Sequence, residues 1–203
     1  MSRYRGPAVK ISRREGVNLS ETPKVQRYME RHPYPPGQHG QARRRKPTDY
    51  AVRLREKQKL RLFYNVSEKQ FRNLFDEAAR REGATGAVFL QLLESRLDNV
   101  VYRLGFARTR RQARQLVTHG HVMVNDRVSG IPSHTLRPGD MVEVRPKSKN
   151  LTAIQDATAV NRRTFNHLEV DRDGLKAKFL DYPSRDDIPE NIREQLIVEL
   201  YSK

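Results

Sequence analysis

The spacing of apolar residues changes at Gly120, and this change limits the fold more than any other feature of the chain. Residues 86–104 carry their apolar side chains on one stripe at helical spacing, which predicts a buried helix. After Gly120, residues 121–125 and 141–145 alternate between apolar and polar positions, as strands do. A chain that needs both periods so close together is expected to pack helices on a sheet.

A second helix is expected between these two patterns. Thr109 and Gln112 form a capping box, which predicts a helix over residues 109–119. Asn125 with Asp126 supplies a turn after the first strand. Residues 94–147 are therefore predicted to be two helices packed on a short antiparallel sheet.

The segments on either side suggest a second domain around this one. Residues 1–18 are basic and lack a clear period, so we expect an extended arm that is disordered unless a partner holds it. Helices are predicted over residues 23–31, 49–64 and 67–83. The C-terminal part is predicted to hold a short helix opened by Ser148, a hairpin over 168–180 and a final strand over 196–201.

The predicted fold class is α+β: a helical N-terminal domain with an inserted small domain of two helices packed on a short antiparallel sheet. The expected divisions are a basic arm and helical domain over residues 1–93, the inserted domain over 94–150, and a C-terminal return to the N-terminal domain over 151–203.

The charge of the chain points to an anionic partner. Forty Lys and Arg against 24 Asp and Glu give a formal net charge of +16. Residues 1–60 hold 16 basic and 5 acidic side chains, residues 61–150 hold 16 basic and 9 acidic, and residues 151–203 hold 8 basic and 10 acidic. The positive excess therefore lies in the first 150 residues.

Other anionic partners are less well supported than nucleic acid. No apolar run approaches the roughly 18 residues of a membrane span, and no signal-peptide core opens the sequence. Cysteine is absent, which fits a reducing cytoplasm and excludes disulfides and thiolate metal sites. Nucleic acid is the expected partner.

Basic side chains in the N-terminal domain are candidates for binding RNA phosphates. The Pro- and Gly-rich stretch 33–47 is expected to be a loop, and its charge run is either an RNA contact or a solvated linker. The helix that follows is charged on most of its circumference, so a protein core alone should stabilise it poorly. The candidates here are Arg43, Arg44, Arg45, Lys46, Arg53, Arg55, Lys57 and Lys59.

The helix over 109–119 is the main candidate in the inserted domain. Its N-terminus offers unpaired N–H groups to a phosphate, and arginine binds phosphate bidentately or stacks on bases. His119 is equally suited to RNA contact and to a structural role. The candidates are Arg108, Thr109, Arg110, Arg111, Arg114, Thr118, His119, Lys147 and Lys149.

Several long segments resemble one known family. YPPGQHGQARRRKPTDYAVRLREKQKLRLFYNVSEKQFRNLF, residues 34–75, resembles the N-terminal domain of bacterial small-subunit ribosomal protein four. SRLDNVVYRLGFARTRRQARQLVTHGHVMVN, residues 95–125, resembles the RNA-binding domain named after that protein, and the ending LIVELYSK is also similar.

The resemblance implies direct binding to ribosomal RNA at a multi-helix junction of the 5′ domain, nucleation of the subunit body, and contact with ribosomal protein five. It also implies a place at the messenger-RNA entry path and a part in decoding accuracy. Some relatives hold zinc through N-terminal cysteines; this chain has none, and His32 with His39 makes a poor metal site, so no metal or cofactor is expected.

Two alternatives remain: a transient ribosome-binding factor, and an RNA-modifying enzyme that carries the same domain. Ser95-Arg96-Leu97-Asp98 resembles the motif that holds the catalytic aspartate of pseudouridine synthases. We interpret Asp98 instead as a surface carboxylate, paired with Arg103 or a loop arginine, because no space remains for a catalytic domain.

Overall fold

A computed structural model of the chain describes residues 4, 6–42, 46–160, 164–188 and 192–202. The chain divides into two compact units, which are described separately: residues 1–77 with 191–203, and residues 78–190. None of the helices in the described ranges is long and apolar enough to cross a membrane.

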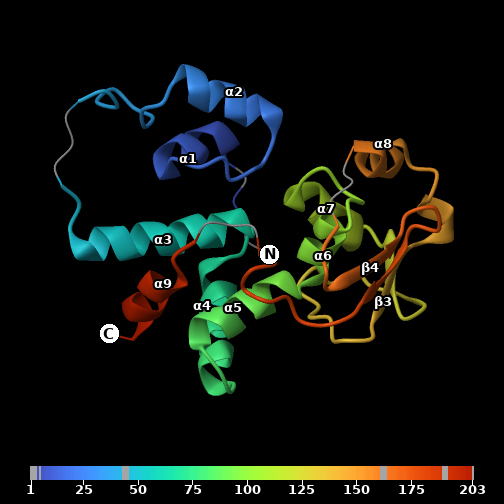
Figure 1. The fold of residues 1–203 in the computed structure, drawn as a ribbon. Helices are drawn as coiled ribbons and strands as arrows, with labels where there is room; N and C mark the ends of the chain where they lie inside the picture. Colours follow the sequence, from blue (N-terminus) through green and yellow to red (C-terminus); the bar gives the residue numbers. More distant parts are fainter. Residues whose placement is uncertain (1–3, 5, 43–45, 161–163, 189–191, 203) are drawn as a thin grey trace. The chain divides into compact units, whose positions relative to one another are not determined.

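The first unit is helical, as predicted. Its longest helix, α3, packs against the C-terminal helix α9, which lies beside it in Figure 1. Leu60 and Phe63 of α3 are buried. The unit contains α1 (Ala8–Glu15), α2 (Pro23–Arg31), α3 (Asp49–Phe63), most of α4 (Glu68–Arg80) and α9 (Glu194–Tyr201).

The expectation of an extended arm over residues 1–18 is wrong for α1. The Ser12 hydroxyl is buried and accepts a hydrogen bond from the Leu19 N–H at 3.2 Å. The Arg13 guanidinium donates to the Tyr34 carbonyl oxygen at 3.0 Å and lies 4.9 Å from the centre of the Tyr34 ring. The helix therefore has contacts of its own within the chain.

The expectation of a final strand over 196–201 is also wrong, because these residues form α9. Ile197 is fully buried, and the Tyr201 ring packs 4.7 Å from the ring of Phe75. The segment is apolar at nearly every position, so its sequence fits either period. Packing of Tyr201 against the aromatic side chains of α4 favours the helix.

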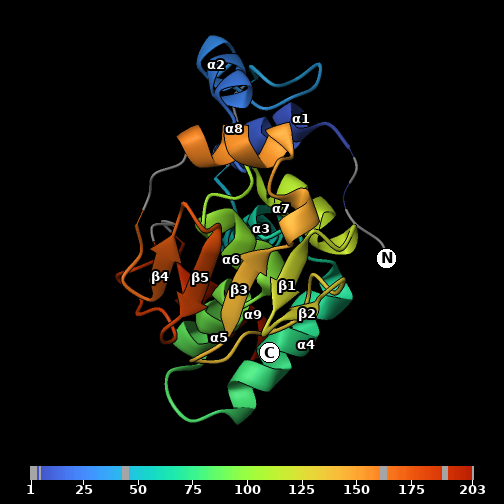
Figure 2. The ribbon, with the colours of Figure 1, turned by 90° about the vertical axis from the view of Figure 1, so that its right-hand side faces the viewer.

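The second unit is a sheet covered by helices, which confirms the α+β class. All pairings in the sheet are antiparallel, in the order β2-β1-β3-β5-β4, and Figure 2 shows the strands side by side with α6 behind them. The helices are α5 (Thr85–Glu94), α6 (Leu97–Arg103), α7 (Arg110–Thr118) and α8 (Thr152–Val160), with a 3-10 turn, η1, over Pro146–Ser148. The strands are β1 (Val122–Val124), β2 (Arg127–Val128), β3 (Met141–Val144), β4 (Leu168–Asp171) and β5 (Lys176–Phe179).

The core of this unit lies between the sheet and the helices. Alternate side chains of the strands, such as Val142, Val144 and Ala177, face Val101 of α6 and Val117 of α7 in one buried cluster. The period of two that the sequence shows after Gly120 therefore becomes the inner face of the sheet.

The predicted helix over 86–104 is two helices, α5 and α6, separated at Ser95 and Arg96. These two residues pair with the segment 134–136 as a strand would. The Leu136 N–H donates to the Ser95 carbonyl oxygen, the Leu97 N–H donates to the His134 carbonyl oxygen, each at 2.8 Å, and Arg96 forms a bridge with Thr135. The apolar pattern of residues 86–104 fits one continuous helix, but pairing with the distant segment 134–136 breaks it into two.

The hairpin predicted over 168–180 is present as β4 and β5, but its place differs from the expected C-terminal return. Strand β5 pairs with β3, so that Val142 lies opposite Ala177. The hairpin thus belongs to the second unit, and only residues 191–203 belong with the first.

Candidate nucleic-acid interface

A buried ionic network joins α5, α6 and α7. At its centre, Glu94 accepts two hydrogen bonds from Arg103, at 2.6 and 2.9 Å, and one from the Asn99 amide at 2.6 Å. The side chains of Glu94 and Arg103 are each only 2% exposed. A two-pronged arginine–carboxylate pair has a fixed geometry, so Glu94 holds the end of α5 against α6.

Asp98 lies in a second buried ionic cluster of α6 and α7, which completes the network, and is not a surface carboxylate. It is 5% exposed and accepts hydrogen bonds from Arg96 at 3.1 and 2.9 Å and from Arg114 at 3.3 Å. The expected pairing with Arg103 is wrong, since Arg103 binds Glu94. Because guanidinium groups occupy both oxygens of Asp98, this carboxylate is poorly placed to act as a nucleophile.

Arg110 and Arg114 connect α7 to the network. The Arg110 guanidinium donates to the Asn99 side-chain oxygen at 2.8 Å and lies 4.5 Å from the centre of the Tyr102 ring. Both arginines are less than a tenth exposed. These two candidates therefore orient α7 from its inner side, where they face the protein.

The exposed stripe of α7 carries Arg111, Gln115 and Thr118, at the helical spacing of four and three residues. The Thr109 side chain caps the helix by accepting from the Gln112 N–H at 3.2 Å, as predicted. Beside the cap, Arg108 forms an exposed ion pair with Asp156 at 3.3 Å. The buried network thus fixes which face of α7 is presented to a partner.

The turn after α7 places further candidates together. The His119 and His121 rings lie 6.1 Å apart, His119 is exposed, and the His121 Nδ1 is 2.9 Å from the Ser148 hydroxyl. Lys147 is exposed, whereas the Lys149 ammonium donates to the Gly174 carbonyl oxygen at 2.8 Å. Of the two lysines, Lys147 is better placed to bind a phosphate.

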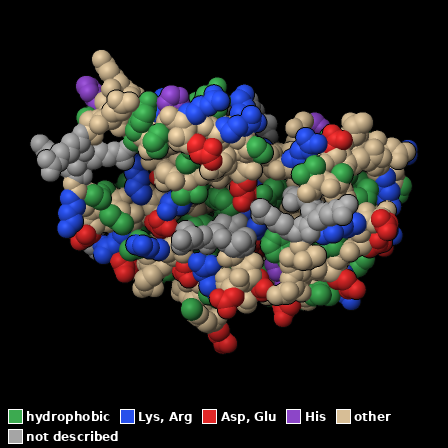
Figure 3. Space-filling view, turned by 45° about the horizontal axis from the view of Figure 1, so that its top comes forward, with side chains coloured by type: hydrophobic (Ala, Val, Ile, Leu, Met, Phe, Trp, Pro, Cys, Tyr) green, Lys and Arg blue, Asp and Glu red, His purple; other side chains and the backbone are tan. Residues whose placement is uncertain are grey.

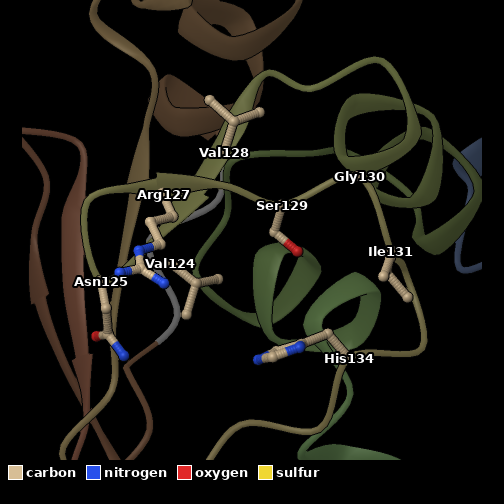
Figure 4. A pocket seen from close by; sticks show the side chains of 8 residues that line it. All are labelled: Val124, Asn125, Arg127, Val128, Ser129, Gly130, Ile131 and His134. Atoms are coloured by element: carbon tan, nitrogen blue, oxygen red, sulfur yellow. The ribbon is translucent and has the colours of Figure 1, made fainter.

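A hollow of about 460 Å³ lies at the end of β1, at β2 and along the segment that follows β2, and sequence reasoning missed it. Figure 4 shows the Arg127 guanidinium, the Ser129 hydroxyl and the His134 ring around one space, with Val124 and Ile131 on its walls. Ile131 is 61% exposed and lines the hollow together with the half-exposed Val128. Apolar walls with polar groups at the rim suit an unstacked base. The lining residues are Val124, Asn125, Arg127, Val128, Ser129, Gly130, Ile131 and His134.

The candidate cations of α3 contact carboxylates within the first unit. Arg53 pairs with Glu199 at 2.8 Å, Arg55 with Glu15 at 3.0 Å, Lys57 with Glu68 at 2.5 Å, and Lys59 with Glu56 at 2.8 Å. The view that a protein core stabilises α3 poorly is therefore corrected: partners as distant in sequence as α9 balance its charge. RNA contact by these four side chains stays a proposal.

Glu68 is the most connected of these carboxylates. Burial raises its pKa, but hydrogen bonds and charge interactions with Lys57, Tyr201 and Arg61 outweigh that effect and lower it. Burial, followed by the charge and hydrogen bond of Glu68, raises the pKa of Tyr201 well above its usual value. Glu68 is therefore ionised at neutral pH and holds α3, α4 and α9 together.

The basic loop is described only in part. Arg43, Arg44 and Arg45 lie outside the described residues, and Lys46 is exposed. Within the described ranges, no three His, Asp or Glu side chains gather as a set of metal ligands.

A row of side chains on α2 was missed by sequence reasoning, although its spacing is visible in PKVQRYMER. Lys24, Arg27, Tyr28 and Arg31 are all exposed and line one hollow of about 310 Å³. Lys and Arg side chains gather in the region of α1 and α2 in Figure 3. The sequence predicts this helix, but which of its faces is exposed depends on how α1 packs against it.

Comparisons with known proteins cover the whole chain. The Ribosomal protein S4/S9 N-terminal domain matches residues 3–94, and the S4 domain matches residues 95–142. The chain is 57% identical over 203 residues to small ribosomal subunit protein uS4 of Salinibacter ruber. It is 56% identical over 211 residues to the protein of that name from Thermus thermophilus, and 51% over 203 residues to that from Geobacillus sp. (strain WCH70). Each alignment spans 100% of both chains. The chain therefore belongs to the family of small ribosomal subunit protein uS4.

Proposed function

We propose that this protein is a structural component of the small ribosomal subunit in the cytoplasm and that it binds ribosomal RNA directly. The observation that carries the proposal is the exposed stripe of α7, which a buried network holds in place before any RNA is bound. Because this face is already rigid, binding loses little entropy in ordering it. The relatives named above are small-subunit proteins, which supports RNA of that subunit as the partner.

The finer role follows from the family resemblance. The protein is expected to bind at a multi-helix junction of the 5′ domain and to nucleate assembly of the subunit body. The protein is also expected to contact ribosomal protein five and messenger RNA at the entry path. Through these contacts it is expected to affect decoding accuracy. Cations on separate parts of the chain suit such a junction, because phosphates of converging helices repel one another.

The alternatives are less well supported. A transient factor could consist of little more than the S4 domain, whereas this chain and its relatives match along their full lengths. An RNA-modifying enzyme would need a reactive carboxylate, and Asp98 is buried under Arg96 and Arg114. The chemistry proposed here is binding alone.

The test is a footprint on naked small-subunit ribosomal RNA with Arg111→Gln. This variant should keep the footprint but weaken it, and should reduce the slope of log K against log salt by about one, as expected for one lost phosphate contact. Arg114 is left unchanged, since its substitution would disturb the buried network. The matched control is Lys178→Gln, which removes one exposed charge from β5. If Arg111→Gln and Lys178→Gln change the affinity and the salt slope equally, α7 is not part of the RNA interface.

A further inference from the structure

The row on α2 has the geometry of a site for a nucleic-acid strand. Lys24, Arg27, Tyr28 and Arg31 follow one another at spacings of three, one and three residues, which places them on one face of the helix. Successive cations are separated by about 4.5 and 6 Å along the helix axis, from the rise per residue. Tyr28 is 43% exposed and lies among them.

No group within the described residues hydrogen-bonds to or forms an ion pair with the side chains of Lys24, Arg27 or Arg31. The one acidic residue of α2, Glu30, lies off this face and accepts a hydrogen bond from Gln26 at 3.0 Å. The α3 cations differ, because each of the four considered above contacts a carboxylate. The row on α2 is therefore a concentration of positive charge that this unit leaves unbalanced.

The other side of α2 is fixed to the protein. Val25 is 4% exposed and Leu19 is 6% exposed, and α1 packs against α2. The Asn18 side chain donates to the Thr22 carbonyl oxygen at 3.1 Å and so ties down the turn that enters the helix. The exposed row is thus held rigidly before a ligand arrives.

We propose that Lys24, Arg27, Tyr28 and Arg31 form a second RNA-binding site, for a single-stranded segment. The three cations bind successive phosphates, and the Tyr28 ring stacks on an unpaired base. An aromatic ring among cations is the arrangement that proteins use to hold single strands without reading their sequence. The inference rests on the proposed function, because the strand is taken to be part of the same ribosomal RNA.

The test compares two triple variants of the full chain on naked small-subunit ribosomal RNA across a salt series. The first is Lys24→Gln with Arg27→Gln and Arg31→Gln. The control is Lys69→Gln with Arg72→Gln and Arg80→Gln, which removes the same charge from one exposed face of α4. That face includes Asp76 and no exposed aromatic residue.

The α2 variant should bind with a slope of log K against log salt that is smaller by about 2 to 3, since each phosphate contact contributes about 0.7 to 0.9. The control should keep the slope of the unmodified protein. Tyr28→Ala should weaken binding about tenfold or more at every salt concentration, whereas Tyr28→Phe should bind as the unmodified protein does.

An unchanged slope in the α2 variant would overturn the proposal and would indicate another partner for this face, such as an acidic protein. Equal losses in the two triple variants would overturn it as well, because the effect would then be one of net charge. If the unmodified protein itself binds this RNA without selectivity, the proposed function fails first, and the second site fails with it.

Discussion

Single residues in the S4 domain show that similar side chains serve opposite purposes. Arg111 and Arg114 belong to one helix and look alike in the sequence, but the first is exposed and the second contacts Asp98 in the protein interior. Sequence reasoning placed both on the RNA side, because it could not see that Asp98 and Glu94 are buried. Buried carboxylates change which arginines are available to a partner.

Replacing Asp98 by Asn should destabilise the protein by about 3–5 kcal/mol, because it removes one charge from a buried network of arginines. Unfolding in urea measures the effect. Asp126→Asn is the control: Asp126 is exposed, with φ of 63°, a conformation that Asn adopts readily. A loss of less than about 1 kcal/mol in Asp98→Asn would contradict the structural role given to the network.

His167 should make stability depend on pH below neutrality. Burial lowers its pKa from the ordinary 6.5, a nearby Arg103 adds to that effect, and Glu94 and Asp187 oppose it. The unfolded chain therefore binds this proton more readily, and stability falls as pH drops below about 6.5, by at most about 1.4 kcal/mol per pH unit. Urea unfolding between pH 7 and 5.5 should show the loss.

The variant that tests this assignment is His167→Phe, which keeps a ring between Phe165 and Phe179 and should flatten the pH dependence. His39→Gln, at an exposed position, should leave the slope as it is. If His167→Phe retains the full slope, another group is responsible.

Elements were predictable from the sequence where neighbours along the chain decide them. The Thr109 cap, the Asn125-Asp126 turn and the alternation of β1 and β3 depend on residues a few positions apart, and all were confirmed. The break between α5 and α6 depends on residues 134–136, and α9 depends on contacts with α3 and α4. A local pattern does not contain these partners.

The helical state of residues 194–201 predicts a strong effect at Ile197. Ile197→Ala should cost about 2–5 kcal/mol, since the side chain is fully buried. Amide hydrogen exchange should show loss of protection in α3 and α9, with the sheet of the second unit less affected. Gln195→Ala, on the exposed face, should stay within about 0.5 kcal/mol of the unmodified protein. Similar costs at both positions would contradict the packing described for α9.

At the scale of the whole molecule, the net charge of +16 is not spread evenly over the described surface. Glu15, Glu68 and Glu199 form ion pairs with cations of α3. The cations Lys24, Arg27 and Arg31 of α2 are exposed and form no such pairs within the described residues. The sequence predicted that the excess serves RNA. It could not predict which cations serve the fold, because the balancing carboxylates come from distant parts of the chain.

The most direct test of this account is the footprint of the intact protein on naked small-subunit ribosomal RNA, with no other protein present, over a salt series. We expect protection of one multi-helix junction in the 5′ domain and affinity that falls steeply with salt, as many phosphate contacts require. Indiscriminate coating of the RNA, or a footprint that needs other ribosomal proteins, would contradict direct and specific binding.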